Sequence, residues 1–82
     1  MIDPSKIIRK ADKEAARLAA LADSVRAERD RRLTACDYRC MPDYPQSDSE
    51  RAAWAQYRQA LRDVPSQAGF PGEVEWPVEP GA

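Results

Sequence analysis

The sequence predicts a mainly α-helical fold, with a long N-terminal helix, a short second helix and an extended aromatic and proline-rich C-terminal tail packed on it. Strong helix formers fill the stretch from residue 5 to Cys36, which has no Gly or Pro. A helix-start pattern at Ser47 and a helix stop at Pro65 bound the second helix. Both tryptophans, the phenylalanine and four of the seven prolines lie from Trp54 to Pro80. The chain is expected to have three parts, at residues 1–36, 37–47 and 48–82.

The first helix is expected to begin at Asp3, as N-cap, with Pro4 at the first helical position. Its apolar positions recur in steps of three and four, which is the spacing of a coiled-coil seam. They are Ile8, Ala11, Ala15, Leu18, Ala22 and Val25. Continuing the register places Arg29 and Arg32 on the seam, so the coiled-coil character ends near Val25. A solitary alanine-rich helix is unstable. We therefore expect this seam to oligomerise or to pack on a partner helix.

The linker at 37–47 contains Pro42 and Pro45, and the second helix begins after it. Ser47 and Glu50 have the spacing of a capping box. Four apolar residues of this helix share one face, because they are spaced 3, 4 and 3: Trp54, Tyr57, Leu61 and Val64. On its flanks lie Arg51, Arg58 and Arg62, whose stems can cover apolar surface.

Beyond Pro65 the sequence predicts a turn at residues 66–69 and then the extended tail. Val74, Trp76 and Val78 alternate as in a strand. The prolines of the tail disfavour a paired central strand, so polyproline-like extension or an edge strand fits better.

The chemistry-bearing residues are too few for an enzyme, and we expect no catalysis, cofactor or metal site. With 82 residues and few large apolar side chains, the core is marginal. The chain has no histidine to serve as a base or a zinc ligand. Cys36 and Cys40 are four residues apart, and structural thiols, a disulfide or redox pair and a metal site are all open readings, the first being favoured.

Charge is distributed unevenly along the chain. Residues 1–41 carry a net charge of +3 and residues 42–82 a net charge of −4, and every charged residue after Arg62 is acidic. Such polarity favours contacts with protein partners over nucleic acid, which usually needs a clearly basic face. The arginines from Arg26 to Arg32 alternate with Glu28 and Asp30, which indicates a salt-bridged helix face. No apolar run has the length of a membrane span or a signal peptide, so we expect a soluble cytoplasmic protein.

The second half resembles the phage tail assembly chaperones, and it is similar to the C-terminal end of some tail-fibre assembly proteins. The matching motifs run in order over roughly residues 26–80: Arg29 to Leu33, Cys36-Asp37-Tyr38, Pro42-Asp43, Trp54, Tyr57 to Asp63, Gly69-Phe70-Pro71, Trp76-Pro77 and Pro80. Tyr38 stands where the family usually has Trp, and Thr34 where it has Leu. Residues 4–25 lie outside the resemblance.

The resemblance implies a role in building phage tails or tail fibres, in the cytoplasm of the infected bacterium. The leading hypothesis is a non-enzymatic assembly factor that binds a tail or tail-fibre protein. Its predicted contact residues are Trp54, Tyr57, Arg58, Leu61, Arg62, Phe70 and Trp76. Packing in a local core is the competing interpretation for Trp54 and Trp76. The alternative function is a structural tail component that stays in the virion, anchored through the N-terminal helix. A nucleic-acid-binding regulator acting through Arg26 to Arg32 is the third class.

Overall fold

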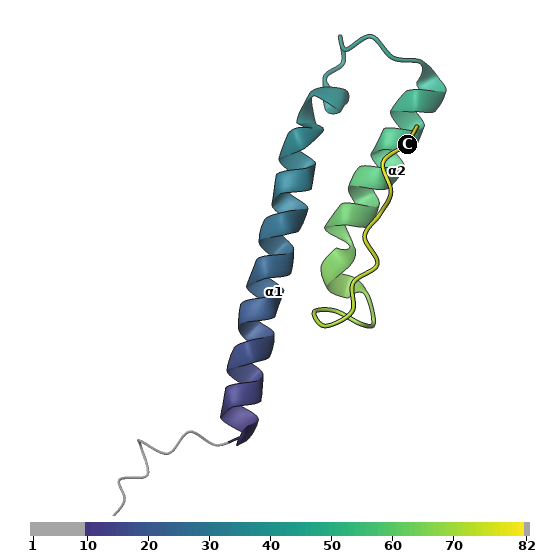
Figure 1. Ribbon diagram of the computed structural model, residues 1–82. Helices are drawn as coiled ribbons and strands as arrows, with labels where there is room; N and C mark the ends of the chain where they lie inside the picture. Colours follow the sequence, from purple (N-terminus) through teal and green to yellow (C-terminus); the bar gives the residue numbers. More distant parts are fainter. Residues whose placement is uncertain (1–9, 82) are drawn as a thin grey trace, which may run out of the picture.

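The computed structural model describes residues 10–81, and these residues form a helical hairpin followed by an extended tail (Figure 1). The elements are α1 (Lys10–Ala35), the 3₁₀ turn η2 (Asp37–Cys40), α2 (Asp48–Arg62) and the 3₁₀ turn η3 (Val64–Ser66). No strand occurs within residues 10–81. The predicted mainly α-helical fold is confirmed. The predicted N-cap at Asp3, Pro4 and the seam residue Ile8 lie outside the described residues.

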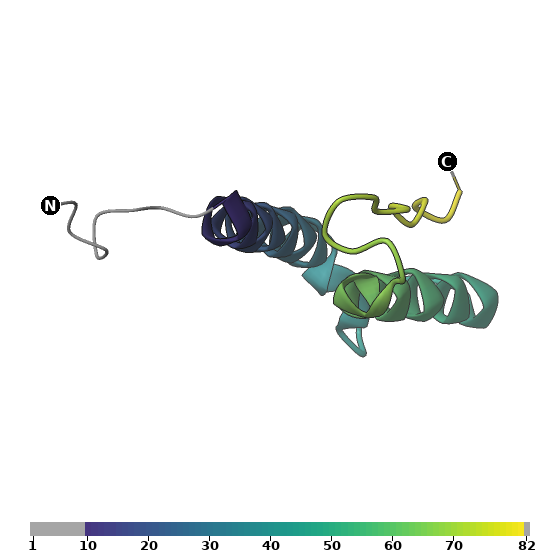
Figure 2. The same ribbon diagram turned by 90° about the horizontal axis from the view of Figure 1, so that it is seen from below.

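The two helices run antiparallel, and the tail returns along them. At 1.5 Å per residue, α1 with 26 residues is about 39 Å long and α2 with 15 residues about 22 Å long. The first turns of α1 therefore extend beyond the hairpin (Figure 1). Figure 2 shows the tail on one side of the helix pair. Its end lies by the first turns of α2, because Pro80 and Gly81 line a surface depression together with Ser49, Glu50 and Trp54.

The start of α2 has the predicted capping box. Ser47 Oγ accepts a 3.1 Å hydrogen bond from the backbone N–H of Glu50, and the Glu50 carboxylate accepts a 3.3 Å bond from the backbone N–H of Ser47. These bonds satisfy two backbone donors that the helix itself leaves unpaired. At its other end, α2 stops at Arg62 and the chain tightens into η3, which contains Pro65.

A small apolar core joins α1, α2 and η3. Its buried cluster comprises Cys36, Trp54, Tyr57 and Leu61, with Leu33 and Trp76 packed against it. Leu61 and Val64 are fully buried, and Val25 is 8% exposed. The rings of Trp54 and Tyr57 meet edge to face, with centroids 5.5 Å apart. The predicted apolar face of the second helix is thus the face that the core uses.

The linker contains a second ordered cluster, centred on Arg39. The Arg39 guanidinium lies over the rings of Trp54, at 4.5 Å, and Tyr44, at 5.1 Å. Gln46 Nε2 donates a 2.8 Å hydrogen bond to the Arg39 carbonyl oxygen. Tyr38 and Tyr44 meet edge to face at 4.9 Å. These contacts fix the connection between α1 and α2, so residues 37–47 form a structured corner.

Candidate partner-binding surface

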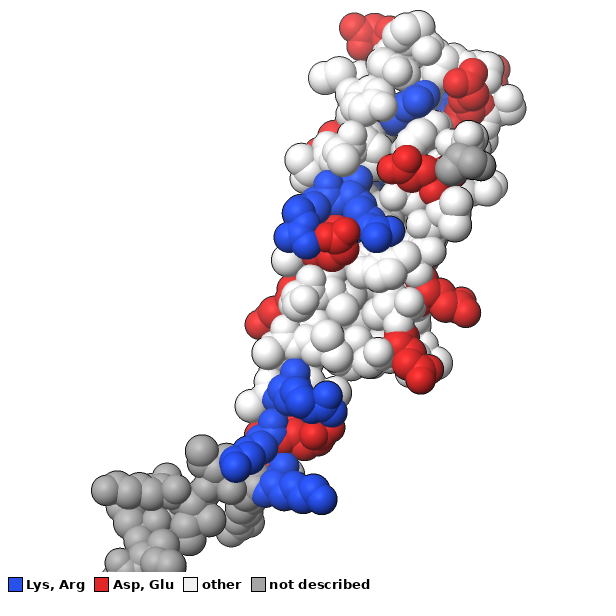
Figure 3. Space-filling model, viewed as in Figure 1, with Lys and Arg blue, Asp and Glu red and all other residues white. Residues whose placement is uncertain are grey.

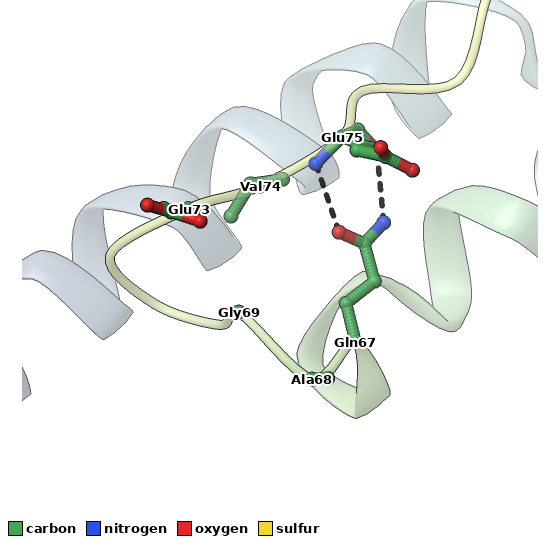
Figure 4. A pocket seen from close by; sticks show the side chains of 6 residues that line it. All are labelled: Gln67, Ala68, Gly69, Glu73, Val74 and Glu75. Atoms are coloured by element: carbon green, nitrogen blue, oxygen red, sulfur yellow. Dashed lines mark hydrogen bonds between the residues drawn. The ribbon is translucent and has the colours of Figure 1, made fainter.

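The tail is directed by a loop that Gln67 closes (Figure 4). The Gln67 side-chain amide donates a 2.8 Å hydrogen bond to the Glu75 carbonyl oxygen and accepts a 2.9 Å bond from the Glu75 N–H. Within the loop, the Glu73 N–H donates a 2.7 Å bond to the Gly69 carbonyl oxygen. This loop reverses the chain after η3, and the residues from Trp76 onward then run back along the hairpin (Figure 1).

Two aromatic side chains of the tail face arginines of α1. The Arg32 guanidinium lies 4.3 Å from the centroid of the Trp76 ring, and that of Arg26 lies 5.3 Å from the centroid of the Phe70 ring. Both rings are half-buried. Stacking of this kind contributes on the order of 0.5–1 kcal/mol at exposed sites. Phe70 and Trp76 are therefore held in position while keeping part of their surface open to solvent.

The predicted contact residues fall into two groups. Four of them are buried in the hairpin: Trp54, Tyr57, Arg58 and Leu61. The other three keep solvent-accessible surface: Arg62 is exposed, and Phe70 and Trp76 are half-buried. The four buried residues stabilise the hairpin. The three solvent-accessible residues lie on the surface, where another protein could contact them.

Arg58 is a buried charge that links the two helices. Its Nη1 donates to the Leu33 carbonyl oxygen at 2.8 Å and lies 3.0 Å from Cys36 Sγ, and its Nη2 donates to Asp37 Oδ1 at 2.8 Å. The sequence pattern predicts Arg58 on the flank of the helix, as a contact residue for a partner. The missed signal is its place between Trp54 and Leu61 on the apolar face, which turns a flank arginine toward the core.

The predicted oligomerisation seam is exposed in its N-terminal part and covered by the rest of the hairpin in its C-terminal part. Ala11, Ala15 and Leu18 are exposed, Ala22 is half-buried, and Val25 is buried within its own chain. Beyond Val25 the next seam positions carry Arg29 and Arg32, so the apolar character lapses there, but the same face of α1 continues into the hairpin. Continuing in steps of four, three and four, it passes Arg32, stacked on Trp76, and reaches the buried Cys36. One face of α1 is therefore covered by the hairpin at its C-terminal end and open at its N-terminal end.

The arginines of α1 are paired with acids of the same helix. Arg31 and Arg32 both bond to the Glu28 carboxylate, which holds the pKa of that carboxyl below its ordinary value, and Arg29 pairs with Asp30 at 3.0 Å. In Figure 3 the blue side chains over α1 accordingly have red ones among them, whereas red groups lie along the opposite edge. This pattern fits the predicted salt-bridged helix face.

The two cysteines do not form a disulfide. Cys36 and Cys40 are free, with Cys36 buried and Cys40 exposed. Within residues 10–81 there is no group of three or more potential metal ligands. None of the helices in the described part of the chain is long and apolar enough to cross a membrane.

A comparison with models of protein families gives a match over most of the chain. The model of the family described as phage tail assembly chaperone protein matches residues 22–81. The matched segment includes most of α1, both 3₁₀ turns, α2 and the tail. Neither a curated protein nor a solved structure matches the chain.

Proposed function

The chain belongs to the phage tail assembly chaperone family, and we propose that it serves tail assembly without catalysis, by binding another phage tail or tail-fibre protein. The observation that supports this proposal is that the family match and the buried part of α1 begin at the same place in the chain. The family match begins at Ala22, and burial in α1 also begins at Leu21 and Ala22. What the family shares is therefore the folded hairpin with its tail, a unit that can present one fixed surface.

The binding surface that we propose is the tail face. Phe70 and Trp76 are half-buried and braced by arginines, and Val78 in the same tail is 78% exposed. Trp and Arg are among the residue types that most often dominate the energy of protein interfaces, and Trp76 lies against Arg32. The buried aromatic residues of α2 support this surface from below, and the exposed Arg62 adds charge at the end of α2.

A pull-down from phage-infected cells tests this proposal. The full chain, tagged at one end, is expected to capture a tail or tail-fibre protein from the cytoplasmic fraction. Trp76→Ala should capture much less of it while keeping its helical circular dichroism. Met41→Ala is the control, because it removes a large apolar side chain that is 57% exposed and takes no part in the ring contacts of the Arg39 cluster. Equal capture by the wild type and Trp76→Ala would remove the tail face from the proposal.

The open part of α1 favours a second candidate, a structural component retained in the virion tail. The seam residues Ala11, Ala15 and Leu18 lie before the family match and are exposed. A helix with an uncovered apolar stripe gains stability when it packs on another helix, either of a second copy or of a neighbouring tail protein. Quantitative mass spectrometry of purified virions separates the candidates: stoichiometric copies per particle support the structural component, and their absence supports a transient assembly factor.

A further inference from the structure

A cavity of about 220 Å³ lies between η2 and the start of α2, away from the tail loop. It is lined by Arg39, Cys40, Arg51, Trp54, Ala55 and Arg58. The four lining residues from α2 are spaced 3, 1 and 3, so they form one continuous face of that helix. Arg39 and Cys40 of η2 provide the facing wall.

The lining contains three guanidinium groups and no acid. Arg58 is paired with Asp37 at 2.8 Å, whereas Arg39 Nη1 lies 3.9 Å from the Glu50 carboxylate and donates a 3.5 Å hydrogen bond to Gln46 Oε1. Arg51 makes no ion pair or side-chain hydrogen bond with any of residues 10–81. The Nε atoms of Arg39 and Arg58 are buried and have no acceptor within the same range. The positive charge around this cavity is therefore only partly compensated.

Two of the three arginines, Arg39 and Arg58, are also held in place before anything binds. The Arg39 guanidinium lies over Trp54, and both Nη atoms of Arg58 are fixed by the contacts to Leu33, Cys36 and Asp37. Preorganised groups lose little conformational entropy on binding. Trp54 and Ala55 add an apolar wall, next to which a charge-assisted hydrogen bond is stronger than in open water.

We propose that this cavity receives a carboxylate of the tail protein that the chaperone binds, either an acidic side chain or a C-terminal carboxylate. The inference rests on the proposed function and adds the chemistry of one contact. Guanidinium groups match carboxylates in charge and in their two-point geometry. The small volume suits a single carboxylate with its short stem. An extended phosphate backbone fits less well, because the acids Asp37 and Glu50 border the site.

Small probes test the cavity directly on the full chain. In ¹⁵N-labelled protein, acetyl-leucyl-glutamate amide should shift the indole N–H resonance of Trp54 in a saturable manner, whereas the glutamine analogue should not. Acetyl-leucine, which carries only a terminal carboxylate, shows whether a C-terminus serves as well. Inorganic phosphate that shifts Trp54 as strongly as the glutamate probe would overturn the preference for a carboxylate.

Arg51→Gln is the informative variant, because Arg51 is half-buried and its loss breaks no bond within residues 10–81. This variant should bind the glutamate probe with an affinity about tenfold lower than that of the wild type. Arg31→Gln makes the same charge change on α1 and should leave the affinity unchanged. Equal affinity of the wild type and Arg51→Gln for the probe would overturn the proposal.

The exposed Cys40 reports on the same cavity in the complex, since the buried Cys36 reacts slowly in folded protein. The captured tail protein should slow alkylation of Cys40 by iodoacetamide. If the full chain captures no tail protein, the proposed function fails. The wild type and Arg51→Gln could instead capture the tail protein equally well, with Cys40 fully reactive in the complex. In that case only the carboxylate site fails, and the proposed function stands.

Discussion

Arg58 in α2 donates a 2.8 Å hydrogen bond to the carbonyl oxygen of Leu33, in the last turn of α1. The last four carbonyl groups of an α-helix have no partner within the helix. The Leu33 carbonyl oxygen also accepts a 3.2 Å bond from the Cys36 N–H, so the Arg58 bond is a second one that ties a side chain of α2 to the backbone at the end of α1. Because Leu33 and the neighbouring Cys36 also pack in the apolar cluster, this polar contact fixes how the two helices meet.

Replacing Arg58 by Met should destabilise the hairpin by about 1.5–3 kcal/mol, the range for the loss of hydrogen bonds made by a charged group. Methionine keeps the apolar stem, so the loss reports on the hydrogen bonds. Urea unfolding followed by circular dichroism gives the measurement. Arg62→Met, on the exposed side of the same helix, is the control and should change the free energy of unfolding by less than about 0.5 kcal/mol. A hairpin with Met at position 58 that is as stable as the wild type would contradict the role given to this contact.

The local pattern of the sequence was sufficient to predict the helices. A long stretch without Gly or Pro predicted α1, and the Ser47 capping box predicted the start of α2, because both signals depend on residues close in the chain. The predicted contact list mixed core and surface residues. Spacing shows that Trp54, Tyr57 and Leu61 share a face, but whether that face meets the same chain or a partner depends on contacts distant in sequence.

The Arg39 cluster is a second feature that the local sequence pattern does not predict. The sequence predicts a linker at residues 37–47, which contains Arg39 and two prolines and shows no periodicity. Its position depends on Trp54, fifteen residues further along the chain, and on Gln46. Cation–π contacts have no fixed sequence spacing, so neither this corner nor the cavity beside it was predicted.

Gly69 is required where the tail loop closes. A Cβ atom at this position would clash with the Glu73 carbonyl oxygen, whereas one at Gly72 would lie 3.9 Å from its nearest neighbour. Gly69→Ala must therefore move the backbone of the loop and should cost about 1–3 kcal/mol, the range for an overpacked site. Gly72→Ala is the matched control and should be nearly neutral. Thermal unfolding measures both, and a neutral Gly69→Ala would show that the loop closes differently.

The raised pKa of Tyr57 predicts that the free energy of unfolding decreases at high pH. Burial, and secondly the negative charge of Glu79, raise the pKa of the Tyr57 phenol. An unfolded tyrosine has a pKa of about 10. The contribution of the neutral Tyr57 phenol to folding stability is complete below the unfolded pKa. It is lost as the pH rises from there through the higher pKa of the folded state. Unfolding free energies measured from about pH 9 to about pH 11 should therefore fall more steeply for the wild type than for Tyr57→Phe.

The same titration tests the position of the tail. Because Glu79 raises the pKa of Tyr57, Glu79→Gln should lower that pKa toward its ordinary value, while Glu75→Gln, which removes another acid of the tail, should leave it unchanged. Phenolate resonances followed by NMR report the pKa of Tyr57 in the folded protein. Identical titrations of Tyr57 in Glu79→Gln and the wild type would place the end of the tail away from α2.

The boundary of the folded module within α1 can be tested by two truncations. A chain that begins at residue 21 keeps Val25, which is buried, and Arg26, which faces Phe70. It should unfold within about 0.5 kcal/mol of the full chain, because residues 10–20 are exposed. A chain that begins at residue 27 loses both contacts. Removal of a buried valine and of an arginine–aromatic contact should cost about 2 kcal/mol or more. Equal destabilisation by the two truncations, measured by urea unfolding, would mean that the exposed turns of α1 belong to the cooperative unit.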